Sequence, residues 1–252
     1  MKAFGMPRPG VADALTIGNA LCGVAAIGVV ILTPWAGDAE DEGATLRIVA
    51  LLVLVGVVLD VCDGAVARAR GGTPLGQHLD SLADVVTFGV ASALAVAGLA
   101  IRHSSSWEAV ALGIAALAYV GAMLVRLADF EAGRNLDRFF TGMPSPLAAV
   151  TALSLGLLAL APWLTAVGIL LVAWLMVSGI RYPRSRGLGL MAEAAGLAVA
   201  VVGLVGVIDV RIPAGLTIVG CVLVAPVAFA VVARRQGRAA AGARITVDRA
   251  EP

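Results

Sequence analysis

The sequence predicts an all-α fold: a helical bundle integral to a membrane, with about eight transmembrane helices and both termini in the cytoplasm. Three observations lead to this prediction. Hydrophobic residues make up 60% of the 252 residues and charged residues only 14%, far from the composition of soluble domains. The hydrophobic residues form long apolar segments, each close to the ~20 residues that cross a bilayer as a helix. Arginine is concentrated in alternate connections, as cytoplasmic loops require.

The apolar segments follow one another along almost the whole chain. Their approximate ranges are 14–34, 45–63, 78–101, 108–128, 145–161, 163–180, 188–209 and 214–233. We therefore expect residues 1–233 to form one transmembrane domain. Residues 234–252 are rich in alanine, glycine and arginine, and we expect them to form a basic, disordered cytoplasmic tail.

Charge predicts the orientation. With the N-terminus inside, only Arg47, Arg102 and Arg211 fall on the outer side, and the acidic loop from Asp38 to Glu42 falls there too. This asymmetry follows the positive-inside rule. The net charge of +1 gives no indication of a nucleic-acid partner. The expected location is the cell membrane, which the chain crosses several times.

The first segment begins within Ala12–Gly23, which reads ADALTIGNALCG. Asn19 is a polar amide inside an apolar helix, so it needs hydrogen-bond partners. It either donates to a bound diphosphate or forms a polar contact between helices. Asp13 stands at the start of the helix, where a carboxylate typically caps the free backbone amides.

Four carboxylates lie where the second and third segments meet. Asp60 and Asp63 are three residues apart, and Asp80 and Asp84 are four apart, so each pair projects from one face of a helix. The turn between them, Gly71–Pro74, allows the chain to reverse. Carboxylates in membrane helices are expensive to bury and usually mark a function.

Four carboxylates brought together in this way would repel each other unless a cation neutralised them. Oxygen ligands suit Mg²⁺ or Mn²⁺, with Ca²⁺ as a further candidate. We therefore expect Asp60, Asp63, Asp80 and Asp84 to bind one or two divalent ions. The alternative interpretation is a set of solvated acids that cap helices or pair with neighbouring arginines.

Small residues accompany the acids. The pattern Asp60-x2-Asp63-Gly64-x2-Ala67-Arg68, followed by Gly76-x3-Asp80-x3-Asp84, resembles the signature of the CDP-alcohol phosphotransferase (phosphatidyltransferase) family. Its members are membrane enzymes that transfer a phospho-alcohol from a CDP-linked donor to a hydroxyl and release CMP. Seven residues separate Arg68 from Gly76 here, one fewer than the family usually has.

The resemblance implies roles for these residues. Asp84 is the candidate base that takes the proton of the acceptor hydroxyl, and it also reaches a metal ion. The donor-binding set is Asn19, Asp60, Asp63, Gly64, Ala67, Arg68 and Gly76. Gly64 and Ala67 remove side-chain bulk, so a ligand can approach the backbone closely. The resemblance also implies a homodimer.

Five further strings resemble phosphatidylserine synthases, the serine-transferring members of this family. They lie at residues 12–23, 80–93, 125–130, 140–146 and 176–183. Arg126 and Arg181 stand at cytoplasmic helix ends within them, and both are candidates to bind a phosphate or the acceptor's carboxylate. For Arg126 the alternative is a snorkelling side chain that anchors the helix to headgroups.

The resemblance thus implies transfer of a phosphatidyl or archaetidyl group from CDP-diacylglycerol or CDP-archaeol to L-serine. The charge asymmetry predicts that the active site faces the cytoplasm. Inositol phosphate and glycerol phosphate are the alternative acceptors, because Arg181–Arg186 is a basic cluster. Outside enzymes, the alternative is a divalent-cation transporter with the acids along its ion path. A transporter would have no need for Gly64, Ala67 and Gly76.

Overall fold

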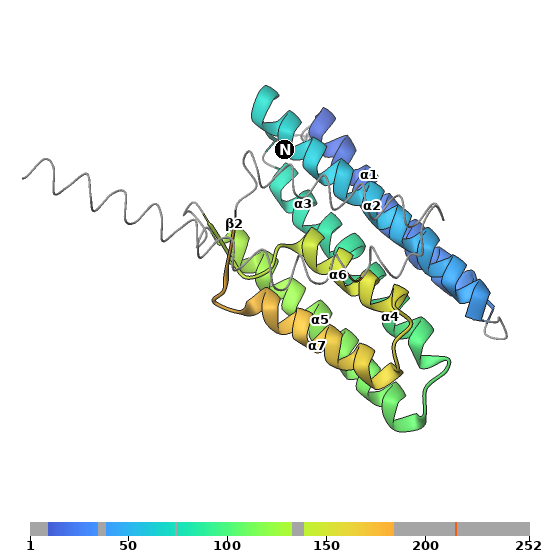
Figure 1. The fold of residues 1–252 in the computed structure, drawn as a ribbon. Coiled ribbons are helices and arrows are strands. Elements are labelled where there is room, and N and C mark those ends of the chain that lie inside the picture. The colour runs from blue at the N-terminus through green and yellow to red at the C-terminus, as the bar shows by residue number, and fades with distance from the viewer. Residues whose placement is uncertain (1–9, 35–38, 74, 133–138, 184–214, 216–252) are drawn as a thin grey trace, which may run out of the picture.

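The computed structural model describes residues 10–34, 39–73, 75–132, 139–183 and 215, and within them the fold is helical apart from one short pair of strands (Figure 1). The bounds are α1 Val11–Leu32, α2 Ala39–Arg70, α3 Gly76–Asp84, the π-helix η1 Val85–Ala91, α4 Ser92–Ile101, α5 Ser106–Glu131, β1 Phe139–Thr141, α6 Ser145–Leu157, α7 Pro162–Val177 and β2 Arg181–Pro183.

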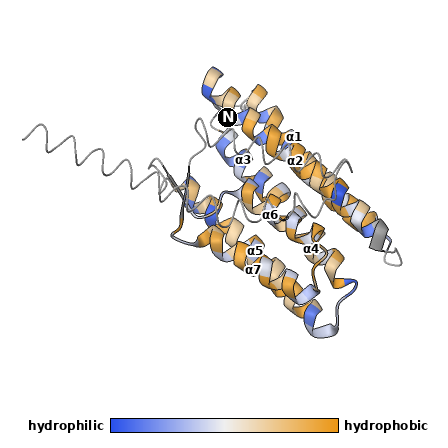
Figure 2. Ribbon diagram, viewed as in Figure 1, coloured by the Kyte–Doolittle hydropathy of each residue, from blue (hydrophilic) through white to orange (hydrophobic). Residues whose placement is uncertain are grey.

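Four helices of the described part are long and apolar enough to cross a membrane: residues 11–32, 42–70, 76–101 and 106–131. They match the first four predicted segments, and Figure 2 shows their largely hydrophobic lengths. The fifth and sixth are shorter than expected, at 13 residues for α6 and 16 for α7. The predicted segments 188–209 and 214–233 lie outside the described residues, except for position 215. By its helix composition the chain is a multi-pass membrane protein.

The helices form a bundle in which α1 packs along α2 and α5 packs along α7. The continuous helix made of α3, η1 and α4 lies between these pairs, together with α6 (Figure 1). At one end of the bundle β1 pairs antiparallel with β2, with Phe140 opposite Tyr182. This end also contains the start of α1, the turn between α2 and α3, and the end of α5 (Figure 1).

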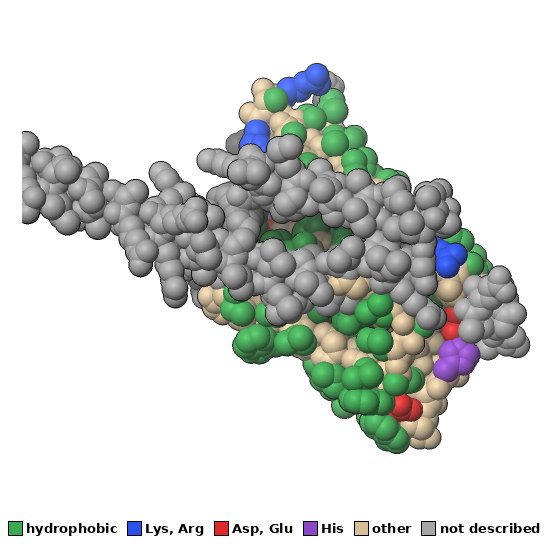
Figure 3. Space-filling model, viewed as in Figure 1, with side chains coloured by type: hydrophobic (Ala, Val, Ile, Leu, Met, Phe, Trp, Pro, Cys, Tyr) green, Lys and Arg blue, Asp and Glu red, His purple; other side chains and the backbone are tan. Residues whose placement is uncertain are grey.

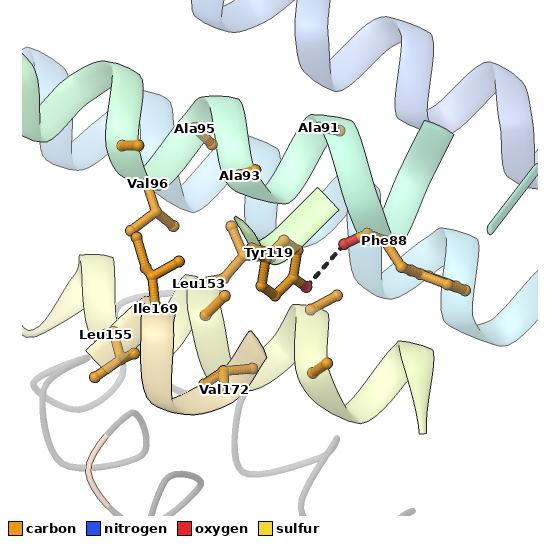
Figure 4. Packing of buried hydrophobic residues seen from close by; sticks show 14 of the residues in the cluster. Phe88, Ala91, Ala93, Ala95, Val96, Tyr119, Leu153, Leu155, Ile169 and Val172 are labelled. Carbon is orange, nitrogen blue, oxygen red and sulfur yellow. Dashed lines mark hydrogen bonds between the residues drawn. The ribbon is translucent and has the colours of Figure 1, made fainter. Parts of the chain in front are cut away.

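The core is built of alanine, valine, leucine and a few aromatic residues, as Figure 4 shows around Tyr119. Large apolar side chains also remain exposed on the outside, including Leu32 and Leu117. In Figure 3 hydrophobic side chains cover much of the visible described surface, and charged ones lie toward its ends. Apolar groups on the outside as well as the inside are what a bundle surrounded by lipid requires.

Two glycines allow the helices beside the acids to approach closely. A Cβ on Gly23 of α1 would lie 2.8 Å from the backbone Cα of Thr87, and one on Gly56 of α2 would lie 2.8 Å from Asn19 Oδ1. The Thr87 hydroxyl donates to the Asn19 carbonyl at 2.8 Å. Helices α1, α2 and η1 are therefore in near-backbone contact next to the acidic residues.

The π-helix begins directly after Asp84. Its wide turns leave carbonyls without regular helical partners, and Tyr119 of α5 donates its hydroxyl to one of them, the Phe88 carbonyl, at 2.9 Å (Figure 4). Tyr119 is fully buried. This hydrogen bond joins α5 to the segment that follows the acidic pair.

Candidate metal centre and active site

Three carboxylates converge between α2 and α3. Asp60, Asp80 and Asp84 each present an oxygen, and these oxygens all lie within 4.8 Å of one another. Asp84 is buried, with 6% of its surface exposed, and the other two are half-buried. Three carboxylates this close repel each other in a low dielectric, and oxygen donors at this separation suit a hard divalent ion. The donor set therefore fits a metal ion.

Helix geometry brings the three together. Asp80 and Asp84 lie one turn apart on α3 and share a face. The chain reverses after α2 through Gly71, whose φ of +85° is unfavourable for residues with a side chain. Helix α2 continues to Arg70, beyond the predicted segment end at residue 63. Asp60 thus lies inside a regular helix, not at its frayed end.

The fourth predicted ligand lies outside this group. The Asp63 carboxylate is buried and accepts a hydrogen bond of 2.6 Å from the Thr16 hydroxyl of α1. Thr16 also contacts the Ala12 carbonyl, at 3.1 Å. The role of Asp63 as a metal ligand stays a prediction.

Asp84 is held from two other helices. The Ser145 hydroxyl at the start of α6 donates to Asp84 Oδ2 at 3.1 Å. The Asn19 side-chain amide of α1 donates to Asp84 Oδ1 at 3.5 Å. Asn19 is fully buried, and its Oδ1 has no hydrogen-bond partner among the described residues. The structure therefore places Asn19 at the acidic group, with one acceptor atom available.

Arg126 of α5 completes the arrangement. Its Nη1 donates to Ser145 Oγ at 2.8 Å, and its guanidinium interacts electrostatically with Asp84 and Asp60. Its Nε is buried and has no hydrogen-bond partner in the described part of the chain. Arg126 thus points into the acidic group, which disagrees with the alternative of an arginine that only anchors the helix to headgroups.

Sequence reasoning did not assign Ser145 to the site. Its position depends on the loop before α6, where Gly142 has a φ of +81°. There the Gly142 amide donates to the Ile180 carbonyl at 2.8 Å, and the Met143 amide donates to the Leu175 carbonyl at 3.0 Å. The only signal for Ser145 in the sequence is the resemblance of residues 140–146 to phosphatidylserine synthases.

The remaining predicted residues lie near the acids without joining them. A Cβ on Gly64 would lie 3.2 Å from Arg68 Nη1, so the exposed Arg68 side chain covers Gly64. Ala67 is half-buried and lies beside Gly72. A Cβ on Gly76 would lie 3.0 Å from Asp13 Oδ1, so a side chain packs against this glycine. The donor-binding roles of these residues stay predictions.

Arg181 is placed only by its backbone. It lies in β2 opposite Thr141, and the description of the structure does not include its side chain. The rest of the predicted basic cluster, residues 184–186, falls outside the described residues. The structure thus brings Asn19 and Arg126 to the three acids, while the role of Arg181 stays a prediction.

Known proteins that are similar in sequence to this chain are named as enzymes that transfer a lipid phosphate group to serine. An archaetidylserine synthase of Methanothermobacter thermautotrophicus is 35% identical over 149 residues, which is 58% of this chain and 62% of that protein. A CDP-diacylglycerol–serine O-phosphatidyltransferase of Bacillus subtilis is 32% identical over 174 residues, 68% of this chain and 89% of that protein. A Saccharomyces cerevisiae protein of the same name is 39% identical over 113 residues, only 39% of its length.

The matches thus range from less than two thirds of the archaeal and yeast relatives to nearly the whole of the bacterial one. A family model described as CDP-alcohol phosphatidyltransferase matches residues 10–180, which contain every helix from α1 to α7 and all the acids of the site. The chain therefore belongs to the CDP-alcohol phosphatidyltransferase family.

Proposed function

We propose that this protein transfers a phosphatidyl or archaetidyl group from a CDP-linked lipid to the hydroxyl of L-serine and releases CMP. The observation that carries the proposal is the group of Asp60, Asp80 and Asp84, in a membrane bundle of a family that uses CDP-alcohol donors. The serine acceptor is supported by relatives that are named for serine transfer.

The reaction joins the serine oxygen to the lipid-bearing phosphorus and breaks the bond from that phosphorus to the bridging oxygen, which leaves with CMP. Bound divalent metal, Mg²⁺ or Mn²⁺ with Ca²⁺ as a further candidate, would neutralise the diphosphate and stabilise the leaving oxygen. Asp60, Asp80 and Asp84 would hold the ion. Asp63 would join them if its carboxylate turned away from Thr16.

Asp84 is the proposed general base. A carboxylate oxygen takes the proton of the serine hydroxyl as the oxygen attacks phosphorus. The hydrogen bonds from Ser145 and Asn19 occupy one direction at each Asp84 oxygen and restrict rotation of the carboxylate. Asp84 is therefore pre-oriented, which lowers the entropy lost on reaching the reactive geometry.

Arg126 is the proposed contact for the carboxylate of serine. Its Nη1 is held by Ser145, while its Nε is available to a ligand. An arginine can bind a carboxylate through two parallel hydrogen bonds. The same guanidinium would keep the acceptor beside Asp84, which shares Ser145 with it. Arg181 is a second candidate for this role or for the donor's phosphates.

Asn19, Gly64, Ala67, Arg68 and Gly76 form the proposed donor-binding set. We place this site on the cytoplasmic side of the cell membrane, because Arg68, Arg70 and Arg126 lie at the same end of the bundle as the acids. The eight-helix topology, the single domain over residues 1–233, the basic tail over 234–252 and a homodimer belong to the same proposal.

The test is CMP release by the purified protein with CDP-diacylglycerol or CDP-archaeol and Mn²⁺ or Mg²⁺. Serine, inositol phosphate and glycerol phosphate are offered in parallel, and Asp84→Asn serves as the control for contaminating activity. Serine-dependent release is expected. Release only with a phosphorylated polyol would overturn the acceptor. Divalent-ion flux into vesicles that contain the protein, without CMP release, would support the transporter hypothesis and overturn the enzyme hypothesis.

A further inference from the structure

One buried carboxylate near the site has no part in the proposed chemistry. Asp13 in the first turn of α1 is 1% exposed. It accepts a hydrogen bond from the Gly10 amide at 2.7 Å, which confirms its prediction as a helix cap. Both of its oxygens also lie within hydrogen-bond distance of the Thr73 hydroxyl, at 2.9 and 3.0 Å. Capping alone does not require this second contact.

Thr73 lies in the turn between α2 and α3. Its hydroxyl donates to Asp13 and accepts from the Gly76 amide at 2.9 Å, and its carbonyl accepts from the same amide at 3.1 Å. Gly76 is the first residue of α3 and lies one turn before Asp80. The hydrogen bonds therefore run without a break from α1, through the turn, to the helix that carries two of the three clustered acids.

Close packing at Gly76 makes this connection tight. A Cβ there would lie 3.0 Å from Asp13 Oδ1 and 3.2 Å from Thr73 Oγ1. The start of α3 is thus seated directly against the Asp13–Thr73 pair. A sideways shift of α3 would have to break these contacts, and it would move Asp80 and Asp84 away from Asp60.

The same face of α1 reaches the acids at two further points. Thr16 holds Asp63 and Asn19 holds Asp84, and Asp13, Thr16 and Asn19 follow one another at intervals of three residues. Such spacing keeps side chains on neighbouring positions of one helical face. Helix α1 thus contacts the turn through Asp13, α2 through Thr16 and α3 through Asn19. These contacts hold α2 and α3 in a fixed position relative to each other.

We infer that Asp13 and Thr73 are a pair of positioning residues that set the separation of Asp60 from Asp80 and Asp84, and through it the affinity of the site for a divalent ion. The inference rests on the proposed function.

The test measures Mn²⁺ binding to the purified protein from the electron paramagnetic resonance signal of the free ion, alongside kcat and KM for CMP release. Thr73→Val removes the hydroxyl and keeps the shape. We expect its dissociation constant for Mn²⁺ to rise roughly tenfold, the lower end of what loss of a supporting contact causes at metal sites. The KM for the CDP-lipid should stay within about twofold of wild type, because no lipid contact is removed.

Three variants separate positioning from general stability. Thr73→Ser keeps the hydroxyl and should restore Mn²⁺ affinity. Asp13→Ala should also weaken Mn²⁺ binding, and the double variant should lose less than the sum of the two single losses, because both changes remove the same Asp13–Thr73 hydrogen bond. Thr151→Val is the matched control, since Thr151 is a buried threonine of α6 whose hydroxyl contacts only the Leu147 carbonyl among the described residues.

Unchanged Mn²⁺ affinity in Thr73→Val, or an equal loss in Thr151→Val, would overturn the inference. A Thr73→Ser variant as weak as Thr73→Val would overturn it as well. Failure of the proposed function looks different, because the wild-type protein itself would then neither bind Mn²⁺ nor release CMP.

Discussion

Ser145 Oγ donates a hydrogen bond to Asp84 Oδ2 at 3.1 Å, although 61 residues separate the two in the sequence. The same hydroxyl accepts from Arg126 Nη1 at 2.8 Å. One serine thereby links the proposed base to the proposed carboxylate-binding arginine. The acceptor hydroxyl must lie beside the base for proton transfer. Because Ser145 contacts both residues, it fixes the position of the proposed acceptor-binding arginine relative to the base.

Ser145→Ala should lower kcat for CMP release about tenfold, as expected for loss of one hydrogen bond to a charged group. The change leaves Asp84 Oδ2 and Arg126 Nη1 without this partner. Ser154→Ala is the matched control, because Ser154 is also a buried serine of α6 but donates to the Val150 carbonyl. Equal effects of the two changes would argue against a specific role for Ser145.

Asp84→Asn should lower transfer by at least ~10²-fold, because the amide cannot accept the proton of the acceptor hydroxyl. Binding of the CDP-lipid should remain measurable by calorimetry in detergent, since the side chain keeps its shape. Near-normal turnover would remove Asp84 as the base.

Asp63→Asn tests whether the fourth acid binds metal in the working enzyme. If it does, the Mn²⁺ concentration for half-maximal activity should rise roughly tenfold or more, together with a loss of kcat. Asp60→Asn provides the reference, because Asp60 lies in the group of three. If Asp63→Asn stays active with an unchanged metal requirement, Asp63 is not a metal ligand and its role is structural, through the hydrogen bond with Thr16.

Arg126→Lys should raise the KM for serine more than the KM for the CDP-lipid. Lysine keeps the charge but lacks the planar pair of donors that matches a carboxylate. Initial rates measured at varied serine and fixed donor check this expectation. A rise confined to the donor's KM would assign Arg126 to the diphosphate.

Gly23→Ala should destabilise the bundle by about 1–3 kcal/mol, the usual size of overpacking a tight interface. The added methyl group would meet backbone atoms of Thr87, which cannot rotate away. Gly28→Ala on the same helix has nothing within 4 Å of the added carbon. Its thermal unfolding in detergent should stay close to wild type, and equal melting of the two variants would contradict the packing argument.

Much of the fold was predictable because membrane helices carry their signal locally. The helices over residues 11–32, 76–101 and 106–131 follow from uninterrupted apolar sequence, since a backbone in lipid must satisfy its hydrogen bonds within the helix. The prediction was less accurate where polar residues continue a helix, as α2 does to Arg70. It was also too long for α6 and α7, whose ends depend on neighbouring chain segments.

The family, the membrane bundle and the acids of the site could be predicted from the sequence, because apolar length and the spacing of Asp60, Asp80 and Asp84 are properties of short stretches. The side chains that bind those acids could not be predicted, because they come from other helices that the fold brings alongside. Nothing in the local sequence distinguishes Ser145, Thr16 and Thr73 from other serines and threonines, because their carboxylate partners are distant in the sequence. A buried carboxylate requires hydrogen-bond donors from whichever helix packs beside it, and that neighbour is chosen by the packing of the whole chain.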